Sequence, residues 1–473
     1  MILFLILIEN IRLTRSDGEA RRGATVGRLT IVRLPEAADG GSRRHAVQYA
    51  HSVACVRAPQ PTCGGVLVMK HGRLALPEGY RVSRRSFVRM ASAASAVALV
   101  RITTEADLAY GQRRIARDIP ADAVLINANE NPLGPCAQAC SAMADLGAKG
   151  GRYEFGLTQE LVKTFAEIEG LKPEYVRAYA GSSEPLHYAV LAFTSPEKSL
   201  VMGDPAYEAP MRAVSYSKAR LFKVPLTKSY AHDVKAMVGA DPNAGVLYIC
   251  NPNNPTGTTT TREDIEYALA NKPKGSILLI DEAYIHFSDA KPVLDLVAAD
   301  KDILVLRTFS KIYGMAGLRC GFAIARPDLL AKLEPYGWNS MPVTAVVAAK
   351  TSLKHKGLVL ERKKINTDIR NDVFSWLATN KYSFVPSESN CFMVDVKRPG
   401  KQFIEAMEAK KVYIGRVWPA WPTHVRVTVG TAPEMEAFKK SFKEAMETPA
   451  QAAQWPRRSA EPWRADRPYP SLS

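Results

Sequence analysis

The sequence is poor in cysteine and has no long uninterrupted run of apolar residues. It contains 7 cysteines among 473 residues. Their odd number and scattered positions argue against a disulfide framework in so large a chain. Cys136 and Cys140 could ligate a metal, but no histidine or cysteine cluster completes a site, so we expect small apolar packing residues. The apolar runs fall far short of the roughly 20 residues in a membrane-spanning helix, which excludes a polytopic membrane protein.

Acidic residues are also in deficit, with 47 Asp and Glu against 63 Lys and Arg, a net charge of +16. Such an excess suggests binding to nucleic acid or a membrane surface. Most of it, however, lies at the ends of the chain: 19 basic and 9 acidic residues precede residue 121, and 4 and 2 follow residue 448. Residues 121–448 keep only 40 − 36 = +4. The part of the chain between the two ends is thus nearly balanced in charge, and the sequence contains no known nucleic-acid-binding motif. Nucleic-acid binding therefore stays a remote alternative. The length and the 47 % hydrophobic content instead predict two or three domains with apolar cores.

Residues 83–89 read Ser-Arg-Arg-Ser-Phe-Val-Arg and precede an uncharged, alanine-rich run from Met90 to Val100. This pattern resembles the twin-arginine export signal, which carries folded proteins out of the cytoplasm. It predicts an exported or periplasmic protein, or a cytoplasmic one if the signal is not used. The alternative is the basic start of an ordinary helix.

The signal divides the N-terminal part of the chain. Residues 1–82 are expected to be a non-native or disordered extension, with translation starting near Met69 or Val82. Residues 83–112 form the signal region, with cleavage near 106–112. The tail 449–473 is rich in Pro, Arg and Trp and is expected to be disordered.

Between residues 120 and 350, short apolar runs alternate with helical patterns. Four runs rich in β-branched residues and Leu are typical of buried parallel strands: Ser199–Met202, Val246–Cys250, Ile277–Ile280 and Ile303–Leu306. Arg262–Ala270 is predicted to be a helix that starts at Thr261, and Leu157, Leu161, Phe165 and Ile168 form the apolar stripe of another. Polar motifs directly follow the four strands. Because ligands bind at the carboxyl ends of strands in such sheets, we expect these motifs to converge on one pocket.

The residues in these motifs suit one cofactor. Lys311 follows a buried strand, where desolvation would free its amine to attack a carbonyl. Asp281, at another strand end, can keep a pyridine nitrogen protonated and so make the ring an electron sink. Asn254 and Tyr284 can donate to a phenolate oxygen. The hydroxyl groups of Thr308 and Ser310 and the guanidinium of Arg319 can bind a phosphate by charge-assisted hydrogen bonds. Together they fit pyridoxal phosphate.

From about Leu125 to Met446, the chain resembles the fold-type I, class I/II pyridoxal-phosphate aminotransferases, most closely the histidinol-phosphate aminotransferase branch. The resemblance rests on Asn127–Gly134, on Ser310–Gly321 around the lysine, and on the order and spacing of Asn254, Asp281 and Lys311. It implies an α/β fold, with a large domain built on a mostly parallel seven-stranded sheet flanked by helices. A smaller α/β C-terminal domain completes the fold.

The implied domains are 120–350 and 352–448, with the segment near 120–150 packing on the second. In the second domain the sequence predicts a long helix, a strand, a helix and a strand, at Leu353–Asn380, Cys391–Val396, Gly400–Lys410 and Val425–Val429.

The resemblance also implies a role for each motif residue. Lys311 binds the cofactor as a Schiff base and moves the proton, Asp281 pairs with the pyridine nitrogen, and Tyr207 stacks on the ring. The phenolic oxygen is bound by Asn254 and Tyr284, and the phosphate by Ser182, Ser183, Ser310 and Arg319. Tyr153 reaches the phosphate of a neighbouring subunit, which implies a homodimer. Substrate is bound by Arg426, which grips the carboxylate, by Asn254, and by Arg416 near the distal group.

Some of these residues keep a simpler explanation. Tyr207 could serve core packing, Ser183 could cap a helix, and Arg416 could be solvated. Family members often carry Asp where Ser183 stands. His187 and His286 are expected to be packing or surface residues.

The predicted function is a homodimeric aminotransferase that moves an amino group from a donor such as glutamate to a 2-oxo acid or to an imidazole- or aryl-bearing ketone. A decarboxylase or lyase of the same fold remains the alternative, since both would use the same lysine, aspartate and asparagine. An exported enzyme fits poorly with a dedicated role in histidine synthesis, so its substrate need not be histidinol phosphate.

Overall fold

The computed structural model describes residues 102–110, 119–337 and 341–448, together with four short strands in the first hundred residues. The chain divides into two units, residues 1–99 and 100–473. In the first, β1 (Phe4–Ile8), β2 (Leu29–Arg33), β3 (Val66–Lys70) and β4 (Arg73–Ala75) form an antiparallel sheet of order β2-β1-β3-β4. The twin-arginine motif, residues 111–118 and the tail 449–473 lie outside the described residues.

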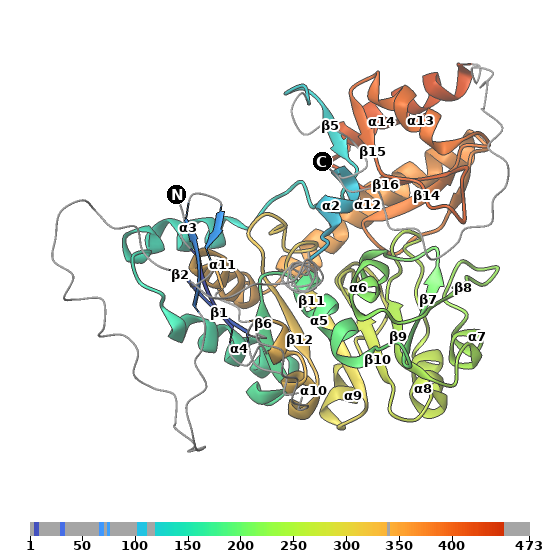
Figure 1. The fold of residues 1–473 in the computed structure, drawn as a ribbon. Helices are drawn as coiled ribbons and strands as arrows, with labels where there is room; N and C mark the ends of the chain where they lie inside the picture. The colour runs from blue at the N-terminus through green and yellow to red at the C-terminus, as the bar shows by residue number, and fades with distance from the viewer. Residues whose placement is uncertain are drawn as a thin grey trace, which may run out of the picture. The chain divides into compact units, whose positions relative to one another are not determined.

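The second unit is built around a seven-stranded sheet of order β6-β12-β11-β10-β9-β7-β8 (Figure 1). Its strands are β6 (Val176–Tyr179), β7 (Ser199–Asp204), β8 (Leu221–Pro225), β9 (Ala244–Cys250), β10 (Ile277–Asp281), β11 (Ile303–Thr308) and β12 (Gly321–Ile324). All neighbours pair in parallel except at β12, which is antiparallel to β11 and β6. The predicted mostly parallel seven-stranded sheet is therefore confirmed, as are the four predicted strands within it.

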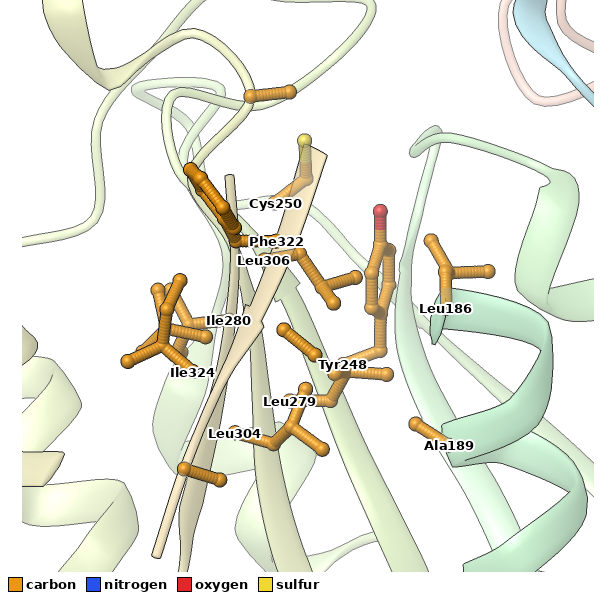
Figure 2. Close-up of a cluster of buried hydrophobic side chains, with 14 of the residues drawn as sticks. Leu186, Ala189, Tyr248, Cys250, Leu279, Ile280, Leu304, Leu306, Phe322 and Ile324 are labelled. Atoms are coloured by element: carbon orange, nitrogen blue, oxygen red, sulfur yellow. The ribbon is translucent and has the colours of Figure 1, made fainter. Parts of the chain in front are cut away.

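The central strands owe their position to their apolar side chains, because strands buried on both faces need continuous apolar runs. Every residue of β9, β10 and β11 is buried. Figure 2 shows this core, in which Leu279, Leu304 and Leu306 project from β10 and β11, and Tyr248 lies between the sheet and helix α5 (Ser183–Phe193).

Helices flank the sheet, as Figure 1 shows. They are α4 (Phe155–Glu169), α5 (Ser183–Phe193), α6 (Ala209–Ser217), α7 (Val234–Gly239), α8 (Arg262–Asn271), α9 (Leu294–Ala298), α10 (Pro327–Ala331) and α11 (Val343–Lys354), with α3 (Ala137–Leu146) packed on α11. The predicted start of α8 is confirmed, since the Thr261 hydroxyl accepts from the Asp264 amide at 3.1 Å. The stripe predicted on α4 is partly wrong: Leu161 and Phe165 are buried, but Ile168 is 54 % exposed.

The C-terminal part has its own core. It contains α12 (Leu358–Thr379), β13 (Ser383–Val385), β14 (Cys391–Asp395), α13 (Gly400–Glu408), β15 (Val412–Ile414), β16 (His424–Thr428) and α14 (Ala432–Glu447). Strands β13, β14 and β16 form an antiparallel sheet, and β15 pairs in parallel with β5 (Val124–Ile126). We call this part the small domain and the part around the seven-stranded sheet the large domain.

Two sequence expectations need correction. The helix predicted from Leu353 to Asn380 is two helices, because the chain turns between α11 and α12 at Gly357, whose φ of +92° suits glycine. Cys140 is exposed rather than packed, whereas Cys136 is buried. Among the described residues, no helix is long and apolar enough to cross a membrane.

Candidate active site

The polar motifs meet at the carboxyl ends of β9, β10 and β11. Asp281 is the last residue of β10 and pairs in register with Cys250 of β9 and Leu306 of β11. Asn254 follows β9 and Lys311 follows β11, so adjacent parallel strands deliver all three side chains to one edge of the sheet.

Lys311 is buried, with 6 % of its surface exposed. Its Nζ donates to the backbone oxygen of Asn129 at 2.9 Å and lies 5.5 Å from the centre of the Tyr284 ring. Burial lowers the pKa of Lys311, since the charged ammonium loses hydration. A lysine in this state has more neutral amine available for attack on a carbonyl.

Asp281 is buried beneath the same site. Burial raises the pKa of this carboxyl to about 6, although Tyr248 opposes the shift by donating from its hydroxyl to Oδ2 at 3.0 Å. The amide of Ala283 donates to Oδ1 at 3.1 Å. Sequence reasoning missed Tyr248, since a tyrosine inside an apolar run is indistinguishable from a packing residue.

Asn254 and Tyr284 lie side by side. The amide of Asn254 is 3.3 Å from the Tyr284 hydroxyl, and the amide of Asn129 donates to the same hydroxyl at 3.0 Å. Burial raises the pKa of Tyr284 well above its usual range, so it stays a neutral hydroxyl. The two predicted residues are therefore together, and Asn129, from the motif that begins at Asn127, is an additional member.

A second cluster of donors lies at the start of α5. Arg319 donates from Nη1 to the Ser310 hydroxyl at 3.3 Å, and the Thr308 hydroxyl donates to the same oxygen at 3.0 Å. The Arg319 guanidinium lies against Gly181, where an added Cβ would stand 2.2 Å from Nη2. Gly181, whose φ is +90°, leads directly into α5. This close approach of guanidinium, hydroxyls and a helix start is an anion-binding arrangement.

Ser182 and Ser183 lie at this same helix start. Ser182 occupies the position before the first residue of α5, and its side chain makes no capping hydrogen bond. Ser183 is the first helical residue, so the simple explanation of Ser183 as a helix cap does not hold.

Tyr207 follows β7 and is 8 % exposed. Burial raises the pKa of Tyr207 well above its usual range, and the charges of Glu105 and Asp281 act in the same direction. Those two carboxylates therefore lie close enough to Tyr207 to affect its ionisation.

Two arginines from the small domain point into the site. Arg426, on β16, is fully buried and donates from Nη1 to Asn254 Oδ1 at 2.9 Å and from Nη2 to the Asn127 oxygen at 2.6 Å. Arg416 is 4 % exposed, which rules out a solvated arginine. The Trp418 ring lies beneath both guanidinium groups, at 4.7 Å from Arg416 and 5.5 Å from Arg426.

Two carboxylates that sequence reasoning missed pair with these arginines. Glu105 Oε1 lies 2.6 Å from Arg416 Nη1 and 2.7 Å from Arg426 Nη2. Glu208 Oε2 lies 2.7 Å from Arg416 Nη2. Glu105 lies more than 300 residues from both arginines in the chain, so no local pattern could have revealed the contact.

One predicted residue does not join the site within this chain. Tyr153 is 77 % exposed and stacks on Phe155, with ring centres 5.5 Å apart.

The arrangement fits pyridoxal phosphate group by group. An amine of lowered pKa, a buried carboxylate, a pair of donors and an anion-binding cluster match its aldehyde, ring nitrogen, phenolic oxygen and phosphate respectively. Gly181 supplies the test of shape: a side chain there would fill the space that Arg319 occupies in the anion cluster. Among the described residues, no cluster of His, Cys, Asp or Glu could hold a metal ion.

Comparison with known proteins gives the same assignment. The sequence pattern of the family "Aminotransferase class I and II" matches residues 121–442. A histidinol-phosphate aminotransferase from Moorella thermoacetica is 31 % identical over 334 residues, covering 68 % of this chain and 85 % of the relative.

Solved structures agree in fold. A protein from Erwinia carotovora atroseptica, provisionally described as a histidinol-phosphate aminotransferase, is 30 % identical with a TM-score of 0.66, covering 70 % of this chain and 98 % of that one. The histidinol-phosphate aminotransferase of Sinorhizobium meliloti in complex with pyridoxal 5′-phosphate has the same fold at 23 % identity and a TM-score of 0.63, covering 68 % and 90 %. The chain belongs to the class I and II aminotransferases and is a pyridoxal-phosphate-dependent transaminase of the α/β, fold-type I class.

Proposed function

We propose that the chain moves an amino group between an amino acid, or a histidinol-phosphate-like amine, and a 2-oxo acid, with pyridoxal phosphate held on Lys311. The observation that carries the proposal is the meeting of Lys311 and Asp281 with buried Arg426 in one site. Lysine and aspartate serve many reactions of amino acids. The arginine adds recognition of a carboxylate, a group shared by an amino acid and a 2-oxo acid.

Each residue has a distinct task. When bound, pyridoxal phosphate would supply an electron sink for the pair left on the substrate α-carbon as its proton departs. Lys311 Nζ, whose pKa burial lowers, would accept that proton and would deliver it to the carbon that carries the aldehyde in the free cofactor. Asp281 keeps the proton on the ring nitrogen, and Asn254 with Tyr284 donates to the phenolic oxygen. Thr308, Ser310 and Arg319 with the start of α5 hold the phosphate.

Arg426 is suited to grip the substrate carboxylate. Asn254 and the Asn127 backbone oxygen hold two edges of its guanidinium, which fixes the plane of the group before substrate arrives. Because the site is buried, a charge-assisted hydrogen bond to a carboxylate there is stronger than in water.

The surroundings of Arg416 favour a particular kind of distal group. Glu208 already pairs with Arg416, which leaves little positive charge for a second anion. Trp418 is buried beneath the guanidinium, so it holds Arg416 in place and does not itself meet substrate. Because the pairing with Glu208 leaves little charge for a phosphate, we favour substrates with an uncharged distal group, such as an aryl or imidazole side chain, over phosphate esters.

We further propose a homodimer, in which Tyr153 binds the phosphate in the neighbouring subunit. Its support is the exposed, stacked pair of Tyr153 and Phe155, since large aromatic side chains this exposed are typical of interaction surfaces. Sedimentation equilibrium should give twice the mass of one chain, and a monomer at micromolar concentration would contradict the proposal.

We also propose export by the twin-arginine route, which rests on the sequence of residues 83–89 and the run after it. N-terminal sequencing of the native protein tests it. A mature chain that starts near residues 106–112 is expected, and a native peptide from residues 10–60 would refute the predicted start of translation.

A panel of donors and acceptors tests the reaction itself. Glutamate, histidinol phosphate and aromatic amino acids are supplied as donors with several 2-oxo acids, and both new products are identified. Transfer is expected to be fastest with an aromatic or imidazole partner. Release of carbon dioxide without any new amino acid would instead favour the decarboxylase alternative.

A further inference from the structure

The short helix α2 (Glu105–Tyr110) precedes the large domain in the chain, yet its first side chain reaches the active site. In Figure 1, α2 lies between the large domain and the small domain. The Glu105 carboxylate contacts Arg426 Nη2 at 2.7 Å, Arg416 Nη1 at 2.6 Å and Asn254 Nδ2 at 3.4 Å. These are the three side chains to which substrate binding is assigned.

The segment 102–110 is held in place along its length. The Thr103 amide donates to Nε2 of buried His187 at 3.0 Å. Leu108 and Ala109 are 5 % and 6 % exposed, and Leu108 belongs to the core cluster of the large domain. The start of the helix is closed locally, since the Thr104 hydroxyl donates to Asp107 at 2.7 Å.

The negative charge of Glu105 prevents a substrate carboxylate from binding the same arginines at the same time. Burial alone would raise the pKa of Glu105, but Arg416 and Arg426 lower it to about 2, so the group is an anion at neutral pH. A substrate carboxylate would need Arg426 while a second anion stood against the same guanidinium. Like charges in a buried site repel strongly, so Glu105 and a substrate carboxylate cannot share it.

We infer that residues 102–110 form an intramolecular plug, in which the Glu105 carboxylate takes the place of the substrate carboxylate between Arg416, Arg426 and Asn254. The inference rests on the proposed function, which assigns Arg426 to that carboxylate. The segment falls where removal of the export signal is predicted, near residues 106–112. A cut after residue 110 detaches Glu105 and Leu108 from the enzyme, so maturation would also open the site.

Binding of maleate to the full chain loaded with cofactor tests the plug without any turnover. Maleate offers a carboxylate to Arg426 and carries no amine to react. The comparison uses the wild type, Glu105→Gln, which removes the charge but keeps the size, and Glu266→Gln as a control that makes the same chemical change in an exposed ion pair with Arg262. Leu108→Ser is a second test, because it loosens the anchoring of the segment without touching the arginines.

A plug closed in nine of ten molecules weakens apparent affinity about tenfold. By calorimetry, Glu105→Gln is therefore expected to bind maleate at least about tenfold more tightly than the wild type. Leu108→Ser should shift affinity in the same direction, and Glu266→Gln should stay within about twofold. In the wild type, saturating maleate should also speed hydrogen exchange of the amides in 102–110.

Unchanged or weaker binding by Glu105→Gln, with unchanged exchange in 102–110, would overturn the plug and make Glu105 a permanent part of the site. The proposed function fails separately. If Glu105→Gln binds maleate as expected but transfers no amino group to any acceptor, the plug stands and the reaction is wrong.

Discussion

Replacement of Arg426 by lysine is the sharpest test of how the site recognises substrate. The change keeps the positive charge but removes the planar group that reaches several partners at once. In the structure, Arg426 Nη1 donates to Asn254 and Nη2 donates to both the Asn127 oxygen and Glu105. A single ammonium at residue 426 cannot keep the hydrogen bonds to Asn254 and to the Asn127 oxygen and also bind both oxygens of a substrate carboxylate.

The expected loss follows from these contacts. At least one charge-assisted hydrogen bond to the substrate disappears, and such a bond contributes roughly 1.5–3 kcal/mol. At 1.36 kcal/mol for each factor of ten, Arg426→Lys should lower kcat/KM about 10- to 150-fold for the amino acid and for the 2-oxo acid. Both half-reactions should suffer alike, because both substrates carry the same carboxylate.

The assay measures kcat and KM for the best donor and acceptor, together with maleate affinity in a Glu105→Gln background. That background separates loss of the substrate contact from loss of the Glu105 contact. Arg262→Lys is the control: this arginine makes exposed ion pairs with Asp295 and Glu266, so its change should stay within about twofold. A folded Arg426→Lys enzyme with unaltered kcat/KM and maleate affinity would refute the assignment.

Three further outcomes follow from other parts of the site and core. Lys311→Ala should abolish transamination, and borohydride should no longer attach the cofactor covalently to the chain as it does in the wild type; transfer at full rate would contradict its role. Tyr248→Phe removes the donor to Asp281 at 3.0 Å, so the pKa of that carboxyl should rise further and the acid limb of the kcat/KM profile should move up by about one pH unit. An acid limb at the wild-type pH would show that the Tyr248 hydroxyl does not control the ionisation of Asp281 during the reaction. Burial lowers the pKa of His232 to about 4. Between pH 6.5 and 4, this imidazole is therefore protonated in the unfolded chain but neutral in the folded chain. Stability from this group is therefore complete above pH 6.5 and falls with pH, by about 2 kcal/mol between pH 7.5 and 5. Urea unfolding should show that the stability of His232→Gln falls less between pH 7.5 and 5 than that of the wild type. An equal fall in the wild type and the variant would refute the role of His232.

The sequence predicted those features that depend on local pattern. Continuous apolar runs marked the buried strands, and Lys311, Asp281 and Asn254 stand in motifs that directly follow them, so their convergence could be expected from sheet geometry alone. The break between α11 and α12 at Gly357 was missed, because the helical pattern continues on both sides and a single glycine is tolerated in a helix.

The remaining features depend on tertiary contacts. Tyr248 lies in the middle of a buried strand, and only the packing shown in Figure 2 reveals that its hydroxyl faces the end of the sheet where Asp281 accepts from it. Glu208 directly follows Tyr207, yet its partner Arg416 belongs to the small domain. Glu105 lies in a stretch whose composition suggests an export signal, so its place between two buried arginines could not be predicted from the chain alone.

The central claim is that Lys311 carries the cofactor in a site that completes half of an amino transfer. The most direct measurement supplies one amino acid to the purified, cofactor-loaded Glu105→Gln enzyme with no acceptor present. We expect one equivalent of 2-oxo acid and one of pyridoxamine phosphate per site, and borohydride reduction before substrate should place the cofactor on the peptide that contains Lys311. Full consumption of the amino acid without any pyridoxamine phosphate, or a label on another lysine, would contradict the claim.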